Sequence, residues 1–362
     1  INLCVIIFYL YLENLMIELS PLEKWSPNDK RLEINTIDAH TGGEPLRIII
    51  NGFPKLNGNT VLEKRNHLAQ EFDHLRRTIM LEPRGHADMY GALIVEPENK
   101  GSDFGVIFMH NEGYSTGCGH AVIAISTVLV ETGIINVIEP ETEINMDVPS
   151  GTIKSYVKVK NNKVNSVRFL NVPSFVEFLD AKISIPGLGT INYDLAFGGA
   201  YYAIVKGEDV GLNSELSKMS EFVDIGMKIK NNIIQDIKIE HPIMSEMNFL
   251  YGTIFIFDPI DNNNHSRNVC VFANGEVDRS PTGTGVSARA AIHYARNEIN
   301  IRETLTIESI IGSTFNVSVI KESQIGPLDA VIPEVVGSAN IVGRNTFWVD
   351  STDDIAQGFM LR

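Results

Sequence analysis

The sequence predicts an α+β fold of two pseudo-symmetric halves, each a β-sheet or barrel wrapped around a central helix. Three landmarks recur in the same order at separations of about 160 residues. The first is an aspartate, three further residues and a Gly-Gly pair before an apolar run, at 38–43 and at 194–199. The second is a loop of small residues around Cys118 and around Thr282, each before a helix-like stretch. The third is a glycine turn before an alternating strand.

The central helices and the strands around them follow from the apolar pattern. One helix is expected to run from the Cys118 loop to about Thr132, and the other from the Thr282 loop to about Asn297. The first contains Ala121–Ile125, which is hydrophobic around its whole circumference, and this predicts a helix buried within a sheet. Short β-rich runs are expected to form strands at 46–50, 91–96, 105–110, 153–159, 201–205, 253–257 and 268–272.

The repeat suggests a division of the chain into two domains. We expect an N-terminal domain at 31–173, which carries the Cys118 motif, and a C-terminal domain at 174–345, which carries the Thr282 motif. Residues 346–362 are expected to form a tail that packs back on the N-terminal domain.

The first residues do not resemble the beginning of a domain. The sequence opens with Ile1, and an apolar run precedes the more polar segment that starts at Met16. No basic residue precedes this run, and the run is too short to span a bilayer. We treat 1–30 as an N-terminal extension and expect 1–15 to be a leader or an artefact of the gene model.

Composition excludes some partners and favours one compartment. The chain has 30 basic and 45 acidic residues, for a net charge of −15. Such a surface repels phosphate backbones and anionic lipids, so we expect neither nucleic acid nor membrane as a partner. The cysteines Cys4, Cys118 and Cys270 are too far apart for a disulfide framework or a zinc motif, and this favours a reducing, cytoplasmic location. Cys270 lies in an apolar run and is interpreted as a core residue.

Cys118 is the first candidate for chemistry because it stands where a helix begins. A helix N-terminus carries a partial positive charge, attracts carboxylates and lowers the pKa of a cysteine placed there. A purely structural cysteine is the alternative. A metal site is also conceivable, with Cys118 and His120 or with His86 and Asp88, but each pair offers too few ligands for zinc.

Four motifs in order resemble those of the proline racemase family. They are the runs at 38–45, 82–89, 117–120 and 278–285, and the resemblance extends from about Ile34 to Arg362. It implies a diaminopimelate-epimerase-like fold of two similar domains with the active site in the cleft between them. It also implies that neither a metal nor an organic cofactor is needed.

The second active-site motif departs from the family pattern. Racemases and epimerases of the family carry a cysteine in each motif, one for each face of the substrate α-carbon, but this chain has Thr282 at the second place. A threonine hydroxyl is too weak an acid to share that task. The Cys/Thr pair resembles dehydratases that act on trans-3-hydroxy-L-proline. We therefore expect Cys118 to remove the α-proton and water to leave, giving Δ2- and then Δ1-pyrroline-2-carboxylate.

Further roles follow from the resemblance. Asp278 is expected to pair with the ring ammonium, and Thr282, on the face opposite Cys118, to position the leaving oxygen or a water. The remaining substrate-binding residues are expected to be Gly119, His120, Gly283 and Thr284.

Two other functions stay open, and one assembly is expected. The protein is alternatively a proline racemase or hydroxyproline epimerase that uses Thr282 as a poor second acid. It is otherwise a non-catalytic imino-acid-binding protein that retained the cleft. We also expect a homodimer.

Overall fold

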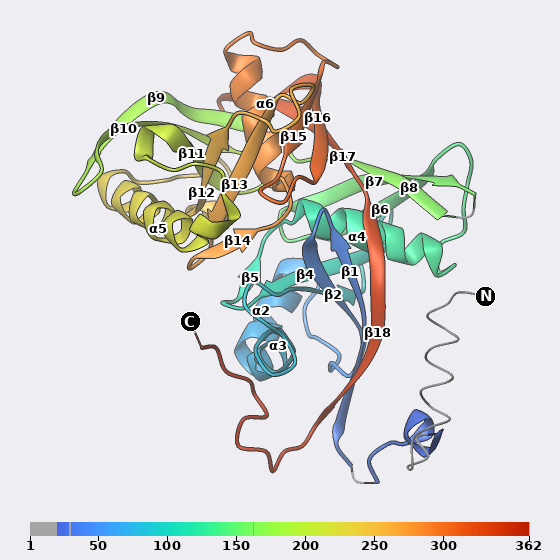
Figure 1. Cartoon of the computed structure of the whole chain (residues 1–362). Coiled ribbons are helices and arrows are strands. Elements are labelled where there is room, and N and C mark those ends of the chain that lie inside the picture. Colours follow the sequence, from blue (N-terminus) through green and yellow to red (C-terminus); the bar gives the residue numbers. More distant parts are fainter. Residues whose placement is uncertain (1–19, 29, 162, 362) are drawn as a thin grey trace, which may run out of the picture.

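A computed structural model of the chain describes residues 20–28, 30–161 and 163–361. It confirms an α+β fold in which strands predominate, with five α-helices in the described part. Figure 1 shows two lobes, with α5 and α6 in the upper one and α2 and α3 in the lower one. The N-terminal residues 1–15, interpreted above as a leader or an artefact, lie outside the described residues.

The first half contains two central features, a mostly antiparallel sheet and the helix α4. Its elements are η1 (Ser20–Lys24), β1 (Leu32–Thr41), β2 (Glu44–Asn51), α2 (Val61–Glu71), α3 (Asp73–Met80), β3 (Tyr90–Val95), β4 (Phe104–His110), β5 (Tyr114–Ser115), α4 (Gly119–Glu131), β6 (Thr142–Val148), β7 (Gly151–Lys160) and β8 (Lys163–Leu170).

The second half repeats this order around the helix α6. Its elements are β9 (Phe175–Ile185), β10 (Gly189–Phe197), β11 (Tyr201–Lys206), η2 (Gly207–Val210), η3 (Leu216–Lys218), α5 (Met219–Asp236), η4 (Ser245–Met247), β12 (Leu250–Phe257), β13 (Ser266–Phe272), β14 (Glu276–Asp278), α6 (Gly283–Ala295), β15 (Thr304–Glu308), β16 (Thr314–Ile325), β17 (Leu328–Gly337) and β18 (Ala339–Val349).

Strand pairing shows that the halves share one topology. In each half a hairpin, β1–β2 or β10–β11, pairs in parallel with the next strand, β3 or β12. Next comes an antiparallel run of three strands, β3–β4–β5 in the first half and β12–β13–β14 in the second. After the central helix, β6 pairs in parallel with β4, and β15 pairs in parallel with β13. The repeat inferred from three sequence landmarks is therefore a repeat of strand order and direction.

Two strands cross between the halves and tie them together. β9, which follows the last strand of the first half, pairs with β10 of the second half. In the same way β18, at the end of the second half, pairs with β1 of the first half along the whole of β1 (Figure 1). β8 and β17 also pair with each other, so one sheet network runs through both lobes. Residues 339–345, assigned above to the C-terminal domain, thus belong to a strand beside β1.

The chain after β18 stays against the first half. Phe359 forms an isolated bridge with Glu82, and Arg84 donates a hydrogen bond to the carbonyl of Ala356 at 3.1 Å. The expected tail and the division into two domains stay predictions.

The central helices α4 and α6 are buried on all sides, as the apolar sequence of the first one predicted. Every residue from Gly119 to Val130 is buried, and so is every residue from Gly283 to Ile292. One apolar core packs around both helices. Their N-termini are fixed by this packing, and the loops before them are held at the junction of the two halves.

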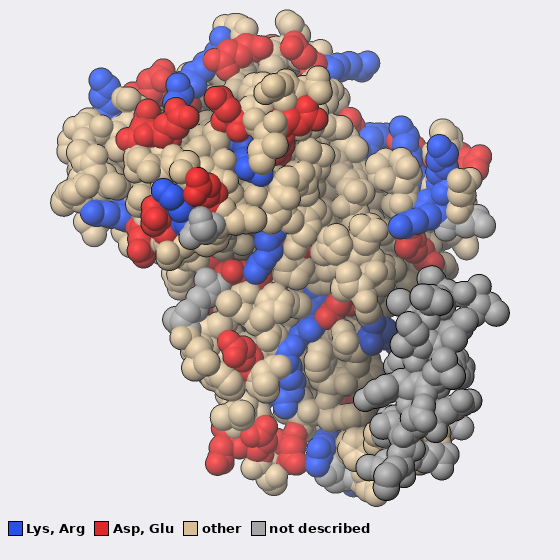
Figure 2. Space-filling model, viewed as in Figure 1, with Lys and Arg blue, Asp and Glu red and all other residues tan. Residues whose placement is uncertain are grey.

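The face of the molecule in Figure 2 carries no continuous stripe of basic residues. Figure 2 shows acidic and basic groups interspersed over both lobes. None of the helices in the described residues is long and apolar enough to cross a membrane.

Candidate active site

A small cavity lies where the N-termini of α4 and α6 meet. It encloses about 310 Å³ of empty space, and all seven residues predicted from the sequence line it. The complete lining consists of Tyr90, Gly117, Cys118, Gly119, His120, Tyr202, Tyr251, Phe272, Asp278, Thr282, Gly283 and Thr284. The two motifs, more than a hundred residues apart in sequence, therefore form one site.

The two helix starts touch each other through backbone. A Cβ atom placed on Gly119 would lie 2.8 Å from the Cα of Gly283, and the reverse placement gives the same distance. Real side chains do not tolerate that spacing, so glycine is required at both positions. The sequence suggested that these glycines open the loops to a ligand; here they also let two positively polarised helix ends converge on one cavity.

Cys118 holds the N-cap position of α4 in an extended conformation, with φ −155°. Its Sγ lies 3.1 Å from Nδ1 of His120. The backbone N–H of Ala121 and the hydroxyl of Tyr90 also lie near enough to the sulfur to lower the pKa of the thiol. The thiol thus points into the cavity with one imidazole, one phenol and one amide around it.

The expected direction of the Cys118 pKa shift is wrong. Burial raises the pKa of the thiol far above its usual range, and the nearby carboxyls of Asp278 and Glu44 raise it further. The helix N–H and the Tyr90 hydroxyl lower it, but by less. Sequence identified the helix end but not the depth of burial, and desolvation is the larger effect here. Burial also lowers the pKa of His120 to about 3, so this imidazole is neutral.

A tight turn connects Asp278 to the start of α6. The carboxylate of Asp278 accepts the backbone N–H of Ser280 at 2.7 Å, and the Ser280 hydroxyl accepts the backbone N–H of Thr282 at 3.2 Å. Burial raises the pKa of Asp278 to about 6. An aspartate at this position is a buried anion that a cationic ligand would stabilise. Asp278 is itself buried and forms part of the cavity wall.

Thr282 is held in an unusual backbone conformation. Its φ of 69° lies in the left-handed region, which β-branched residues rarely occupy. Within the described residues its buried hydroxyl makes no hydrogen bond of ordinary geometry, although it lies near enough to Asp278 and Cys270 to lower the pKa of both groups. Cys270 itself is a buried core residue on β13, as the sequence predicted, and stands behind Thr282 outside the cavity lining.

An aromatic wall completes the cavity, and sequence reasoning missed it. Tyr90, Tyr202, Tyr251 and Phe272 come from four strands of both halves. The hydroxyl of Tyr202 bonds Oγ1 of Thr284 at 2.7 Å and orients that side chain. Tyr90 directly follows the motif at 82–89, which was the available signal. The other three lie in ordinary apolar runs, where nothing local marks them.

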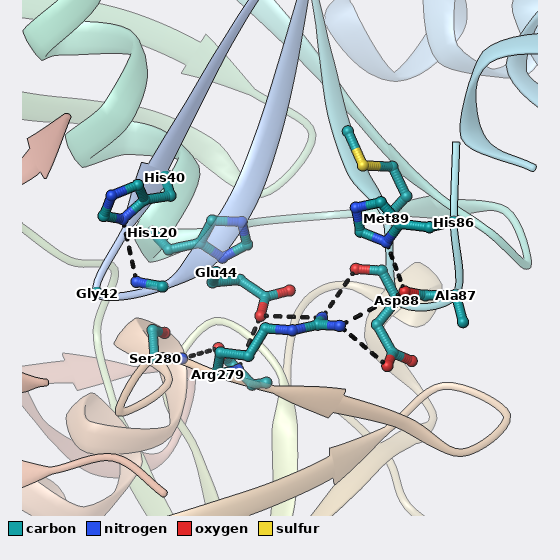
Figure 3. Close-up of polar contacts among 12 residues, drawn as sticks. His40, Gly42, Glu44, His86, Ala87, Asp88, Met89, His120, Arg279 and Ser280 are labelled. Atoms are coloured by element: carbon teal, nitrogen blue, oxygen red, sulfur yellow. Dashed lines mark hydrogen bonds and ion pairs between the residues drawn. The ribbon is translucent and has the colours of Figure 1, made fainter. Parts of the chain in front are cut away.

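Arg279 joins the two halves beside the cavity. Its backbone N–H donates to Oε2 of Glu44 at 2.7 Å, and its guanidinium lies 3.6 Å from the same oxygen and 3.4 Å from Oδ2 of Asp88. Figure 3 shows this side chain lying between Glu44 and the Asp88 segment, with His120 close by. The contacts link the loop before α6 to the first half. The motifs at 38–45 and 82–89 supply the partners.

A metal centre is not formed by the residues weighed above. Among the described residues, no group of three or more histidine, cysteine, aspartate or glutamate side chains is arranged to hold a metal ion. The ring of His86 instead lies against the carbonyl of Ala87, at 2.7 Å.

Comparison with known proteins identifies the family to which this chain belongs. The family model described as proline racemase matches residues 36–360. The chain is 47% identical over 343 residues to a trans-3-hydroxy-L-proline dehydratase of Colwellia psychrerythraea, covering 94% of this chain and 97% of that one. It is 43% identical to a 3-hydroxyproline 2-epimerase of Burkholderia multivorans, covering 91% and 98%.

A solved structure agrees with the fold. A hydroxyproline epimerase from Agrobacterium vitis with bound trans-4-hydroxy-L-proline superposes with a TM-score of 0.85 at 31% identity, covering 92% of this chain and 96% of that one. The protein belongs to the proline racemase family, and its fold is the two-lobed, diaminopimelate-epimerase-like fold expected from the motifs.

Proposed function

We propose that this protein is a trans-3-hydroxy-L-proline dehydratase, a hydro-lyase that forms Δ1-pyrroline-2-carboxylate through Δ2-pyrroline-2-carboxylate. The proposal rests on the difference between the residues that precede the two central helices. A thiol stands at the start of α4 and a threonine hydroxyl at the start of α6. A hydroxyl cannot exchange protons with a carbon acid at neutral pH, so inversion lacks its second partner. A dehydratase of the same family from Colwellia psychrerythraea is 47% identical.

Substrate binding is assigned to the charges around the cavity. The ring ammonium pairs with Asp278, and the substrate carboxylate lies between the N-termini of α4 and α6, where backbone N–H groups and two helix dipoles favour an anion. The His120 and Thr284 side chains complete the pocket, with Gly119 and Gly283 providing close backbone approach. As the α-proton leaves, negative charge spreads onto the carboxylate, and the same donors stabilise it more strongly.

Substrate binding also changes the ionisation of Cys118. Burial, and to a smaller extent the negative charge of Asp278, raise the pKa of the thiol and favour its protonated form. A cationic ring beside Asp278 cancels that charge, and the lowered pKa then favours the thiolate. The base is thus formed when the substrate is present, which protects the free thiol from oxidation.

The chemistry then needs one base and one departing group. The Cys118 thiolate takes the α-proton, the C2–H bonding pair passes into the ring as an enolate-like carbanion, and the C3–O bond breaks with its pair. The product enamine, Δ2-pyrroline-2-carboxylate, tautomerises to the Δ1-imine. No step requires a proton to be returned to the second face of the α-carbon.

The decisive experiment compares four imino acids. Purified protein is incubated in D2O with trans-3-hydroxy-L-proline, the two 4-hydroxy-L-proline isomers and L-proline, and the products are followed by NMR. We expect pyrroline-2-carboxylate from the 3-hydroxy substrate alone. Substantial inversion of proline or of a 4-hydroxyproline would favour the racemase or epimerase alternative. Binding without turnover of any of the four would favour a sensor.

Two accompanying expectations are part of the proposal. We propose a homodimer, which sedimentation analysis would test, and a cytoplasmic location, which fractionation of the source cells would test. The expected partner is a small-molecule substrate, bound by the residues that line the cavity.

A further inference from the structure

The stereochemistry of the proposed substrate fixes the side on which water leaves. In the trans isomer the 3-hydroxyl and the carboxylate lie on opposite faces of the ring. The α-hydrogen also lies opposite the carboxylate, so it shares a face with the hydroxyl. A base that removes this hydrogen therefore stands on the same side as the departing oxygen. This step rests on the proposed function, and it moves the leaving oxygen away from Thr282 and toward Cys118.

Tyr90 is a proton donor beside Cys118 in the cavity lining. It stands at the start of β3 and lines the same cavity as Cys118, and its hydroxyl is near enough to the sulfur for each group to shift the pKa of the other. Its ring contacts the His120 ring edge to face at 4.8 Å between centroids and stacks on the His110 ring at 5.7 Å. These contacts leave the ring little freedom, so the hydroxyl is held beside the thiol.

Ser115 provides a second partner for the same hydroxyl. Its Oγ forms a short hydrogen bond with the Tyr90 oxygen, and both groups are buried. A phenol that donates a proton in the reaction acquires negative charge transiently. A hydroxyl bonded to the same oxygen stabilises that charge.

Other groups near the cavity fit the task less well. His120 is neutral, since burial lowers its pKa to about 3, and a neutral imidazole is a very weak acid. Thr282 stands on the opposite face. Burial raises the pKa of Glu44, which favours its protonated form, but Glu44 does not line the cavity.

We propose that Tyr90 is the catalytic acid for the departing 3-hydroxyl and that Cys118 resupplies its proton. The thiolate takes the α-proton and becomes a thiol. As the C3–O bond breaks, the Tyr90 O–H donates to the leaving oxygen, and the Cys118 S–H donates to the phenol oxygen. Water leaves, Tyr90 is again protonated and Cys118 is again a thiolate. The α-proton has in effect been passed to the leaving oxygen, and no oxidant, reductant or second thiol is consumed.

The test separates proton donation from a structural role by changing the leaving group. Tyr90→Phe keeps the ring and its packing and removes only the hydroxyl. The variant is assayed on trans-3-hydroxy-L-proline and on trans-3-chloro-L-proline, from which chloride leaves with its bonding pair and needs no proton. Tyr201→Phe is the matched control, because it removes a buried tyrosine hydroxyl that bonds Glu240 outside the cavity.

We expect Tyr90→Phe to lower kcat for the hydroxy substrate by about 10²-fold or more and to leave kcat for the chloro substrate within a few-fold, as expected for loss of a general acid. The Tyr201→Phe protein should match the wild type on both. Equal losses on the two substrates would overturn the proposal, because they would mean that Tyr90 only shapes the site. An unchanged kcat on the hydroxy substrate would overturn it as well.

Two further results keep the test decisive. If Tyr90→Phe does not fold, Ser115→Ala replaces it, with a loss of about tenfold expected on the hydroxy substrate only, in line with removal of one hydrogen bond in the transition state. Equal effects on both substrates again overturn the proposal. A wild-type enzyme that releases chloride but never dehydrates the hydroxy substrate would instead contradict the proposed function.

Discussion

The N-termini of α4 and α6 hold equivalent places in the repeat but differ in chemistry. At α4, Cys118 has an extended backbone and a sulfur surrounded by His120 and Tyr90. At α6, Thr282 has a left-handed backbone and a hydroxyl without an ordinary hydrogen bond among the described residues. The residue at the start of α4 is a thiol beside an imidazole and a phenol, whereas the residue at the start of α6 is a hydroxyl.

The two halves share their topology, but the side chains at their helix starts differ. Strand order, helix length and the backbone contact of Gly119 with Gly283 keep the symmetry of the repeat. The side chains at the same two places break it. A symmetric scaffold thus supplies two helix dipoles for one carboxylate, while asymmetric side chains assign proton transfer to one face.

The largest effect on the rate of dehydration is expected from substitution of Cys118. Cys118→Ser replaces a thiolate by an alcohol that does not ionise near neutral pH, so dehydration of trans-3-hydroxy-L-proline should fall by about 10³-fold or more. Cys270→Ala is the control, since this cysteine is buried behind Thr282 and outside the cavity lining. Steady-state kinetics on both variants check this. Undiminished turnover by Cys118→Ser would end the argument for a thiolate base.

A loss almost as large is expected from Asp278→Asn, because the ring ammonium loses its partner. In wild-type protein, burial raises the pKa of Asp278 to about 6, and the ion is needed for binding. The kcat/KM value should therefore fall as the pH drops through 6. In Asp278→Asn, kcat/KM should be lower by about 10²-fold, and this acidic limb should be absent. A variant that keeps a limb near pH 6 would assign it to another group.

The same substitution should stabilise the protein, with a definite pH dependence. The folded-state pKa of Asp278 exceeds its ordinary value of 3.8, so its stability contribution is complete below about pH 4 and is lost as the pH rises through 6. Asparagine removes that loss. Thermal unfolding of Asp278→Asn should show a higher Tm than wild type at pH 8, by the equivalent of up to roughly 3 kcal/mol, and little difference at pH 4. Equal Tm values at pH 8 would contradict this account.

Much of this arrangement was predictable from the sequence, for reasons that specific residues show. The Cys118 and Thr282 loops were recognisable because turns and helix starts need particular local residues. The aromatic wall was not, since Tyr202 and Tyr251 look like ordinary strand residues until the sheet brings them together. The direction of the Cys118 pKa was also missed, because burial depends on the whole fold while a helix dipole depends on local sequence.

A moderate effect is expected when the two helix starts are made alike. Thr282→Cys places a second thiol opposite Cys118 and restores the pair found in racemases and epimerases of the family. Dehydration should fall by several-fold to about tenfold, because the carbanion can now be protonated on its second face before water leaves. Chiral chromatography of recovered substrate should reveal 2-epimer that the wild type does not form. Unchanged dehydration with no epimer would show that Thr282 occupies a place where no group reaches the α-carbon.

The smallest effect on catalysis is expected from substitution of Arg279, which connects the two halves outside the cavity. Arg279 contacts Glu44 and Asp88 across the halves and is not part of the cavity lining. Arg279→Ala removes the guanidinium contacts but keeps the backbone bond to Glu44, so we expect KM to rise by a few-fold to about tenfold with kcat nearly unchanged, in line with the modest energy of partly exposed ion pairs. Arg279→Lys should recover part of the loss, because it restores the charge but cannot reach Glu44 and Asp88 with two separate nitrogens. A fall in kcat at unchanged KM would mean that this bridge aligns the two helix starts in the transition state, so that the asymmetry between Cys118 and Thr282 depends on the closure of the lobes.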